Sequence, residues 1–240
     1  MTTDISPEGL LAVYNALEWT PTGKVAVKLS TGDPPASNYL RPELIKDVVQ
    51  LVGDTIVECN TAYGGSRAST AHFAGYDSYL VLSHFKGHAM AGYGGAIKNI
   101  PIGLGSQEGK CLIHTGGQSR TSPWVGDQTA FTESMAEAGK SVSDYLISGE
   151  RIVYVNVMNR LSIDCDGNPA EPYLHDIGIL ASAGPVALDQ ACIDLVYAQK
   201  DGGASLAERI ESRNGLHTLE HAEEIGLETR TYTLVVNIDD

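Results

Sequence analysis

The feature that most constrains the fold is an alternation of short apolar runs with helical patterns along the whole chain. Five apolar runs predict strands, over residues 24–30, 54–60, 78–84, 151–159 and 176–182. Helical patterns lie between several of them, such as residues 41–53, where Pro42 opens the helix and Gly53 closes it. Strands that alternate with helices are typical of an α/β fold, so we expect a Rossmann-like, largely parallel sheet flanked by helices.

Three further elements complete this pattern. A long helix is expected after the N-cap Asp127, with a buried stripe formed by Phe131, Met135, Ala138, Val142 and Tyr145. Two short helices are expected near residues 204–213 and 217–225, followed by a last strand, TYTLVVN. The 240 residues, 42% of them apolar, suffice for one domain over residues 1–240, which could divide into lobes of about 1–125 and 126–240.

Polar or glycine-rich segments follow directly after the strands. The segments are TGDPP, TAYGGSR, FKGH, RLSIDCDGN and AGPVALD. In open α/β sheets, ligands bind beyond the carboxyl ends of the strands. We therefore expect these five segments to converge on one ligand site, although polar loops at strand ends are the simpler explanation.

The net charge of −14, from 30 acidic and 16 basic side chains, argues against two classes of partner. Nucleic acids and anionic membranes are bound by clusters of Lys and Arg, so neither is expected. The four cysteines form no CxxC pair, which argues against a zinc ribbon or a ferredoxin-type motif in this chain. Without a signal-peptide pattern at the start or a long apolar run, we expect a cytoplasmic protein.

Reactive side chains and glycines are concentrated in LSHFKGHAMAGYGGAIKNIPIG, residues 82–103. His84 and His88 could ligate a metal or transfer protons, or they could be ordinary hydrogen-bonded histidines. Because Gly87 separates them, we expect His84 to end a strand and His88 to lie on the loop beyond it. Glycines allow a ligand to approach the backbone closely, although a tight turn would also explain them; the candidate contacts are Gly92, Gly94 and Gly95.

Other candidates follow this loop or lie on neighbouring ones. Lys98 is a candidate cofactor anchor or amine nucleophile, and the alternative is a solvated lysine. His114 is a candidate metal ligand, and so is Cys165, although an ordinary turn is the slightly favoured interpretation of the loop DCDGN. His217 and His221 have metal-pair spacing, but a solvated acidic helix face is the favoured reading. The remaining candidate cofactor contacts are Asn60, Thr61 and Asn99.

Four stretches together resemble the domain-of-unknown-function family 362. They are SHFKGHAMAGYGGAIKNIPIG, ECNTAYGGSR, VAVKLSTGDPPASNYLRPEL and DIGILASAGPVALDQACIDLV. Many members of that family carry ferredoxin-type cysteine modules, so the resemblance implies an association with iron–sulfur centres. Family members have several dozen more residues before YDSYLVLSH, so either a segment between Thr70 and Tyr76 is absent here or the connection between the two strands is irregular.

The pattern H-x-x-A-G-Y-x-G-G-x-K is, more distantly, similar to the catalytic region of nickel-dependent lactate racemases. That resemblance implies that His88 is a catalytic acid or base, that Lys98 holds the nickel-pincer cofactor and that His114 ligates the metal. Arg67 matches a racemase arginine, but Ser66 stands where the racemase loop has a histidine, which puts racemisation in doubt. Arg67 would bind a carboxylate or phosphate bidentately.

Three functions follow as hypotheses. The first is a metal- or cofactor-binding enzyme that moves a proton or hydride at a carbon next to a carboxylate. The second is an iron–sulfur-associated electron-transfer protein with a redox partner. The third is a non-catalytic scaffold in which the glycine loop only packs.

Overall fold

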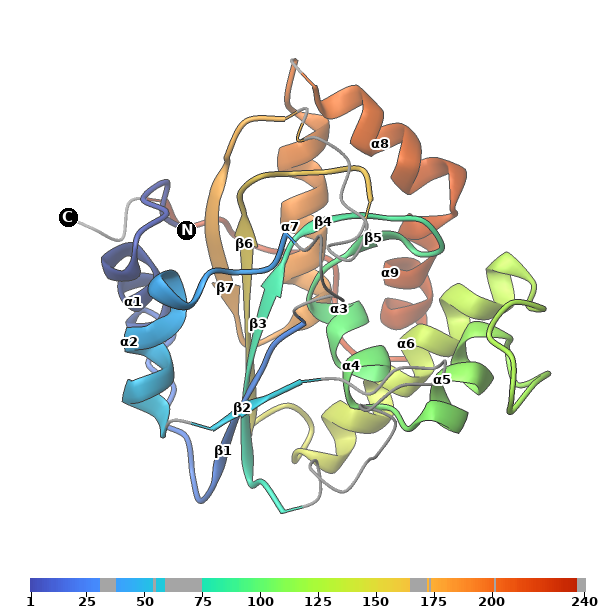
Figure 1. Ribbon diagram of the computed structural model, residues 1–240, viewed down its shortest axis with the longest axis horizontal. Helices are drawn as coiled ribbons and strands as arrows, with labels where there is room; N and C mark the ends of the chain where they lie inside the picture. The colour runs from blue at the N-terminus through green and yellow to red at the C-terminus, as the bar shows by residue number, and fades with distance from the viewer. Residues whose placement is uncertain are drawn as a thin grey trace.

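The central sheet is formed by apolar runs close to those expected. A computed structural model describes residues 1–30, 38–53, 55–58, 75–164, 172, 174–200 and 202–236. The strands are β1 (Val25–Lys28), β2 (Ile56–Val57), β3 (Ser78–His84), β4 (Lys86–His88), β5 (Gly92–Gly94), β6 (Ile152–Met158) and β7 (Gly178–Ser182). Within the described ranges, five of them form one sheet in the order β2-β1-β3-β6-β7, and β4 pairs with β5 as a separate hairpin (Figure 1).

The sheet is largely parallel, as expected, but β7 is an exception. β1 is parallel to both β2 and β3, and β3 is parallel to β6, whereas β7 is antiparallel to β6. The expectation that all five polar segments converge is therefore wrong for AGPVALD, because β7 ends at the opposite edge of the sheet. An apolar run indicates a strand but carries no information on its direction.

Helices cover both faces of the sheet. They are α1 (Pro7–Asn15), α2 (Pro42–Val52), α3 (Ala96–Asn99), α4 (Pro101–Leu104), α5 (Gln107–His114), α6 (Gln128–Tyr145), α7 (Pro185–Tyr197), α8 (Gly203–Ser212) and α9 (Gly215–Glu224). Figure 1 shows α1 and α2 on one side of the sheet and α3 to α9 on the other. Across the described residues, no helix combines the length and apolarity that crossing a bilayer requires.

Burial on both faces explains the continuous apolar strands. Val27 and Leu80 belong to the core that contains α1 and α2, whereas Ala26 and Val81 belong to the core on the other face. Successive side chains of a strand point to opposite faces, so a strand covered on both sides needs apolar residues at every position.

The expected start of α6 is confirmed, but its buried stripe ends differently. The Asp127 carboxylate caps the helix by accepting hydrogen bonds from two backbone N–H groups, those of Thr129 and Ala130. After Met135 the stripe shifts by one position: Ala138 and Val142 are only partly buried and Tyr145 is 82% exposed, whereas the residues that follow them are buried, namely Gly139, Ser143 and Leu146. The stripe drifts around the helix because the α-helical repeat is 3.6 residues, so the position after Tyr145 faces the core.

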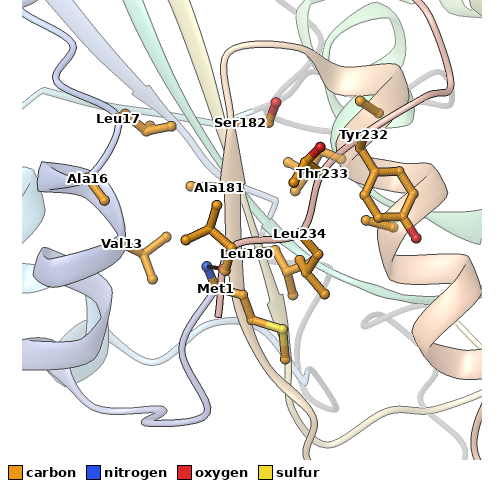
Figure 2. A pocket seen from close by; sticks show the side chains of 14 residues that line it. Met1, Val13, Ala16, Leu17, Leu180, Ala181, Ser182, Tyr232, Thr233 and Leu234 are labelled. Carbon is orange, nitrogen blue, oxygen red and sulfur yellow. Dashed lines mark hydrogen bonds between the residues drawn. The ribbon is translucent and has the colours of Figure 1, made fainter. Parts of the chain in front are cut away.

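The strand expected at residues 231–237 is wrong over the described residues 231–236, which lie in no strand. The free edge of β7 is instead paired by Thr2, which exchanges backbone hydrogen bonds with Ile179. A cavity of about 260 Å³ lies between α1, β7 and this C-terminal segment (Figure 2). Its lining is mostly apolar and includes Val13, Leu180 and Leu234.

Candidate functional site

The carboxyl ends of three parallel strands, β1, β3 and β6, meet at one edge of the sheet. Lys28 is the last residue of β1, and His84 is the last residue of β3. The Nε2–H of His84 donates to the carbonyl of Asn159, 2.6 Å away, just after β6. This edge is where the sequence predicts a ligand site.

The expected glycine loop is a β-hairpin. His88 ends β4 and is paired with Gly92, so it lies in a short strand rather than on a loop. Gly92 has a φ of +80°, and a Cβ there would lie 2.9 Å from the carbonyl oxygen of Ile210 in α8. The glycine therefore allows both the turn and the close packing of α8 on the hairpin.

Asn99 joins the ends of β1 and β3. Its Nδ2 donates to the hydroxyl of Ser83 at 3.1 Å, and its Oδ1 accepts from Ser30 at 2.9 Å and from the Lys28 ammonium at 3.1 Å. The Asn99 amide is therefore committed to contacts within the fold. Its expected role as a cofactor contact is untested and stays a prediction.

Four of the eight lysines in the chain lie on β1, the hairpin, α3 and α5. Lys28, Lys86 and Lys110 are almost fully buried, with exposed fractions of 0%, 8% and 2%. Lys98, in α3, is partly exposed, and its positive charge lowers the pKa of both His88 and His114. In a protein with a net charge of −14, this is a strong local concentration of positive charge.

His88 is held as a neutral hydrogen-bond donor. Its Nδ1 accepts hydrogen bonds from the backbone N–H groups of Met90 and Ala91, each at 3.1 Å. Burial lowers its pKa well below 6.5, and the charges of Lys98 and Lys86 lower it further. A neutral imidazole that accepts through Nδ1 carries its proton on Nε2.

His114 has the opposite tautomer. Its Nδ1 lies 2.7 Å from the backbone carbonyl of Lys110, and a carbonyl can only accept, so Nδ1 carries the proton. Burial lowers the His114 pKa to about 4, although the hydrogen bond to Lys110 acts in the other direction. The imidazole stacks on Phe131 of α6 with ring centroids 5.0 Å apart. The Nε2 of this neutral ring therefore has a lone pair for a proton or a metal.

The expected metal ligands do not form a cluster in the described part of the chain. There, no group of three or more His, Cys, Asp or Glu side chains is arranged to hold a metal ion. Four candidates lie outside the described residues: Asn60, Thr61, Arg67 and Cys165. The roles proposed for them, and for His84, His88, Lys98 and His114, stay predictions.

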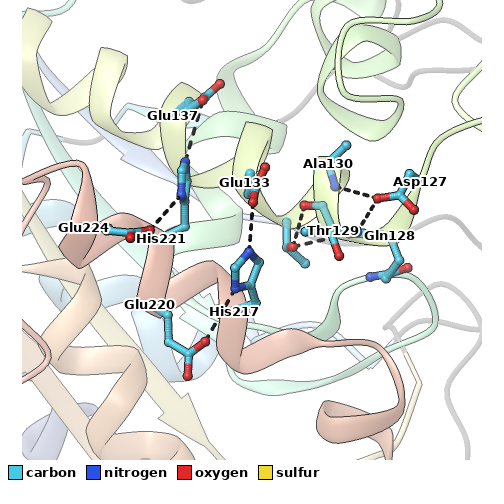
Figure 3. Close-up of polar contacts among 11 residues, drawn as sticks. Asp127, Gln128, Thr129, Ala130, Glu133, Glu137, His217, Glu220, His221 and Glu224 are labelled. Atoms are coloured by element: carbon cyan, nitrogen blue, oxygen red, sulfur yellow. Dashed lines mark hydrogen bonds and ion pairs between the residues drawn. The ribbon is translucent and has the colours of Figure 1, made fainter.

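His217 and His221 face α6 rather than solvent (Figure 3). His217 Nε2 lies 3.0 Å from Glu133, and His221 Nε2 lies 3.7 Å from Glu137. The hydrogen bond to Glu133 raises the pKa of His217. The two histidines thus link α9 to α6, and the solvated face favoured from the sequence is not what the structure contains.

Sequence reasoning missed three of the site's lysines, Lys28, Lys86 and Lys110. The available signal was weak, because a lysine after VAV at a strand end usually reaches solvent. Gly103 also bears on the burial of Lys28, since a Cβ at this position would lie 2.5 Å from the Lys28 side chain. That small residue leaves room for the buried lysine, which only the folded arrangement reveals.

The fold and this edge define a three-layer α/β protein whose strand ends gather lysines and neutral histidines. The family model for the domain of unknown function DUF362 matches residues 57–194. Because the match covers more than half of the chain, the protein belongs to the DUF362 family. The matched range includes the hairpin, α3 to α6 and the strands β6 and β7. No curated protein matches the chain.

Proposed function

We propose that the protein binds a small carboxylate at the carboxyl ends of β1, β3 and β6 and transfers a proton at the adjacent carbon. The observation that carries this proposal is that positive charges act on both histidines in an acidic protein: those of Lys98 and Lys86 on His88, and those of Lys98 and Lys110 on His114. Ammonium groups near a water-poor site attract an anionic ligand strongly and select against neutral ones.

The two neutral histidines supply complementary groups for proton transfer. His114 can accept a proton through Nε2, since its Nδ1–H is held by the Lys110 carbonyl. His88 can donate a hydrogen bond through Nε2–H, because its Nδ1 is occupied by two backbone N–H groups. A neutral imidazole donor can polarise a carboxylate or carbonyl oxygen without losing its proton. We therefore assign the base to His114 and the electrophile to His88, whereas the racemase resemblance alone leaves His88 as acid or base.

As an alternative to the base role of His114, the residues present also fit the nickel-pincer cofactor that the racemase resemblance implies, and in that form the Nε2 of His114 would ligate the metal and could not accept a proton. A metal-ligating histidine usually donates its other ring N–H to a carboxylate or carbonyl, as His114 does to Lys110. Lys98 would anchor the cofactor, and its charge already acts on His114. When bound, such a group would supply a hydride acceptor. Elemental analysis of anaerobically purified protein for nickel, iron and zinc tests this part of the proposal.

The iron–sulfur alternative rests on cysteines that the structure does not describe. Cys111 and Cys192 are fully buried, and burial raises the pKa of both thiols, which disfavours the thiolate that a cluster needs. The remaining candidates, Cys59 and Cys165, lie outside the described residues. A visible absorption band bleached by dithionite, with iron and sulfide in equal amounts, would favour this alternative.

Replacing Lys98 with alanine is expected to weaken the binding of lactate by about tenfold or more, since a charge-assisted contact contributes about 1.5–3 kcal/mol. The melting temperature should change little, because Lys98 is only partly buried. Calorimetric titration with lactate measures the affinity, and the methyl ester of lactate tests the need for the negative charge.

Lys140→Ala is the matched control. Lys140 lies on α6 and pairs at 2.9 Å with Asp144, away from the strand ends. The Lys140→Ala protein should bind lactate with the same affinity as the wild type. Equal affinities in Lys98→Ala and the wild type would contradict the proposed anion site.

A further inference from the structure

Asp189 is a fully buried carboxylate of α7 that connects this helix with α3 and with β6 of the central sheet. Although it lies in α7, its Oδ1 accepts a hydrogen bond from the backbone N–H of Ala96 at 2.8 Å, and its Oδ2 accepts from Ile97 at 2.9 Å. Oδ1 also accepts from the Nδ2 of Asn156 in β6, at 2.7 Å. The carboxylate thus caps the start of α3, the helix that carries Lys98 and Asn99.

Gly95 explains how the carboxylate comes so close. A Cβ at this position would lie 2.4 Å from Asp189 Oδ1, which is closer than real Cβ contacts. From the sequence, the glycine was expected to let a ligand approach the backbone. In the structure, the group that approaches is the carboxylate of Asp189 itself.

The surroundings of Asp189 do not favour its negative charge. The titratable groups that interact with it are the phenols of Tyr93 in β5 and Tyr154 in β6, and the thiol of Cys192 in α7. Burial raises the pKa of Asp189 to about 6, and its three hydrogen bonds offset this only in part. Glu228, which accepts from the backbone of Val186, adds a further negative charge near Tyr154.

We propose that Asp189 is the positioning residue of the anion site, because its ionised carboxylate holds α3 so that Lys98 faces the ligand. This role rests on the proposed function. When the carboxylate takes up a proton, near pH 6, its hydrogen bonds from Ala96 and Ile97 lose their charge assistance. The hydrogen bonds that hold α3 are then weaker, so Lys98 is held less firmly and the affinity for an anion falls.

The test is the affinity for lactate between pH 5 and pH 7, a range in which lactate remains ionised. The wild-type affinity is expected to fall several-fold from pH 7 to pH 5. Asp189→Asn should bind lactate about tenfold more weakly at pH 7, and its affinity should change little with pH. His114, whose pKa is about 4, contributes little to the change in this range.

Asp194→Asn is the matched control. Asp194 lies in the same helix but is exposed and bonds with Gln190 and Tyr232, so this variant should keep the wild-type pH profile. A wild-type affinity that is constant between pH 5 and pH 7 would overturn the role of Asp189, even if Asp189→Asn failed to fold. A folded Asp189→Asn protein with the wild-type profile would also overturn it.

The same titrations separate this inference from the proposed function. If Lys98→Ala binds weakly while Asp189→Asn behaves like the wild type, the anion site stands and only the positioning role fails. If Lys98→Ala binds as tightly as the wild type, the anion site itself fails, and the positioning role fails with it.

Discussion

Between pH 7 and pH 4, the free energy of unfolding of His114→Gln is expected to fall by about 3 kcal/mol less than that of the wild type. In the folded protein, burial lowers the pKa of His114 from 6.5 to about 4, against the hydrogen bond to Lys110. The unfolded chain takes up this proton near pH 6.5, whereas the folded protein does so only near pH 4. The contribution of neutral His114 to stability is therefore complete above pH 6.5 and is lost as the pH falls toward 4.

The measurement is the free energy of unfolding in urea at pH 7 and pH 4, for the wild type and His114→Gln. His88, with its lowered pKa, destabilises the fold in the same direction as the pH falls. Asp189 acts oppositely, because its raised pKa gives stability that is lost as the pH rises through about 6. Both groups are present in both proteins, so their effects cancel in the comparison.

His217 provides the control, because its hydrogen bond to Glu133 raises its pKa. His217→Gln should lose more stability on acidification than the wild type does, the opposite sign to His114→Gln. If His114→Gln loses as much as the wild type, His114 is not held neutral in the folded protein.

The sheet was predictable where burial is uniform along a strand. The run at 78–84 matches β3 residue for residue, because both faces of that strand are covered and every position is buried, with an apolar stretch at its centre. The direction of β7 was not predictable, since direction depends on the connections and not on the residues of the strand. The failed strand at the C-terminus has a similar cause: a β-prone segment forms a strand only where an edge is free to pair, and Thr2 already pairs with Ile179 at the edge of β7.

The site was predictable as a location but not as a set of contacts. The rule for strand ends pointed to His84, which ends β3, and to His88, Lys98 and His114, which lie on the elements after it. This rule could not predict the tautomers of the histidines, because these depend on the backbone N–H and carbonyl groups that contact the rings. The rule also could not predict the contact between Asp189 and Ala96, because residues 93 positions apart in the sequence are brought together only by the whole fold.

Gly87→Ala is expected to destabilise the protein by about 3 kcal/mol, because the new methyl group would collide with main chain. A Cβ at Gly87 would lie 2.2 Å from the carbonyl oxygen and 2.4 Å from the carbonyl carbon of Ile163. The Gly87 N–H also donates to the carbonyl of Ser162 at 2.7 Å, so β4 could move away only by breaking that hydrogen bond. His88 would move with β4, so lactate binding should weaken in any protein that remains folded.

Gly139→Ala offers the matched control for this change. Gly139 lies within α6, and a Cβ there would make only ordinary contacts, at 3.6 Å or more, with Ile100 and Ile97. Alanine in a helix interior is favoured over glycine by up to about 1 kcal/mol, so this variant should be as stable as the wild type or more so. Urea unfolding of the three proteins should therefore give shifts of opposite sign for the two variants. A Gly87→Ala protein as stable as the wild type would mean that β4 does not pack directly against the chain at Ile163, and the position assigned to His88 would then have to be abandoned.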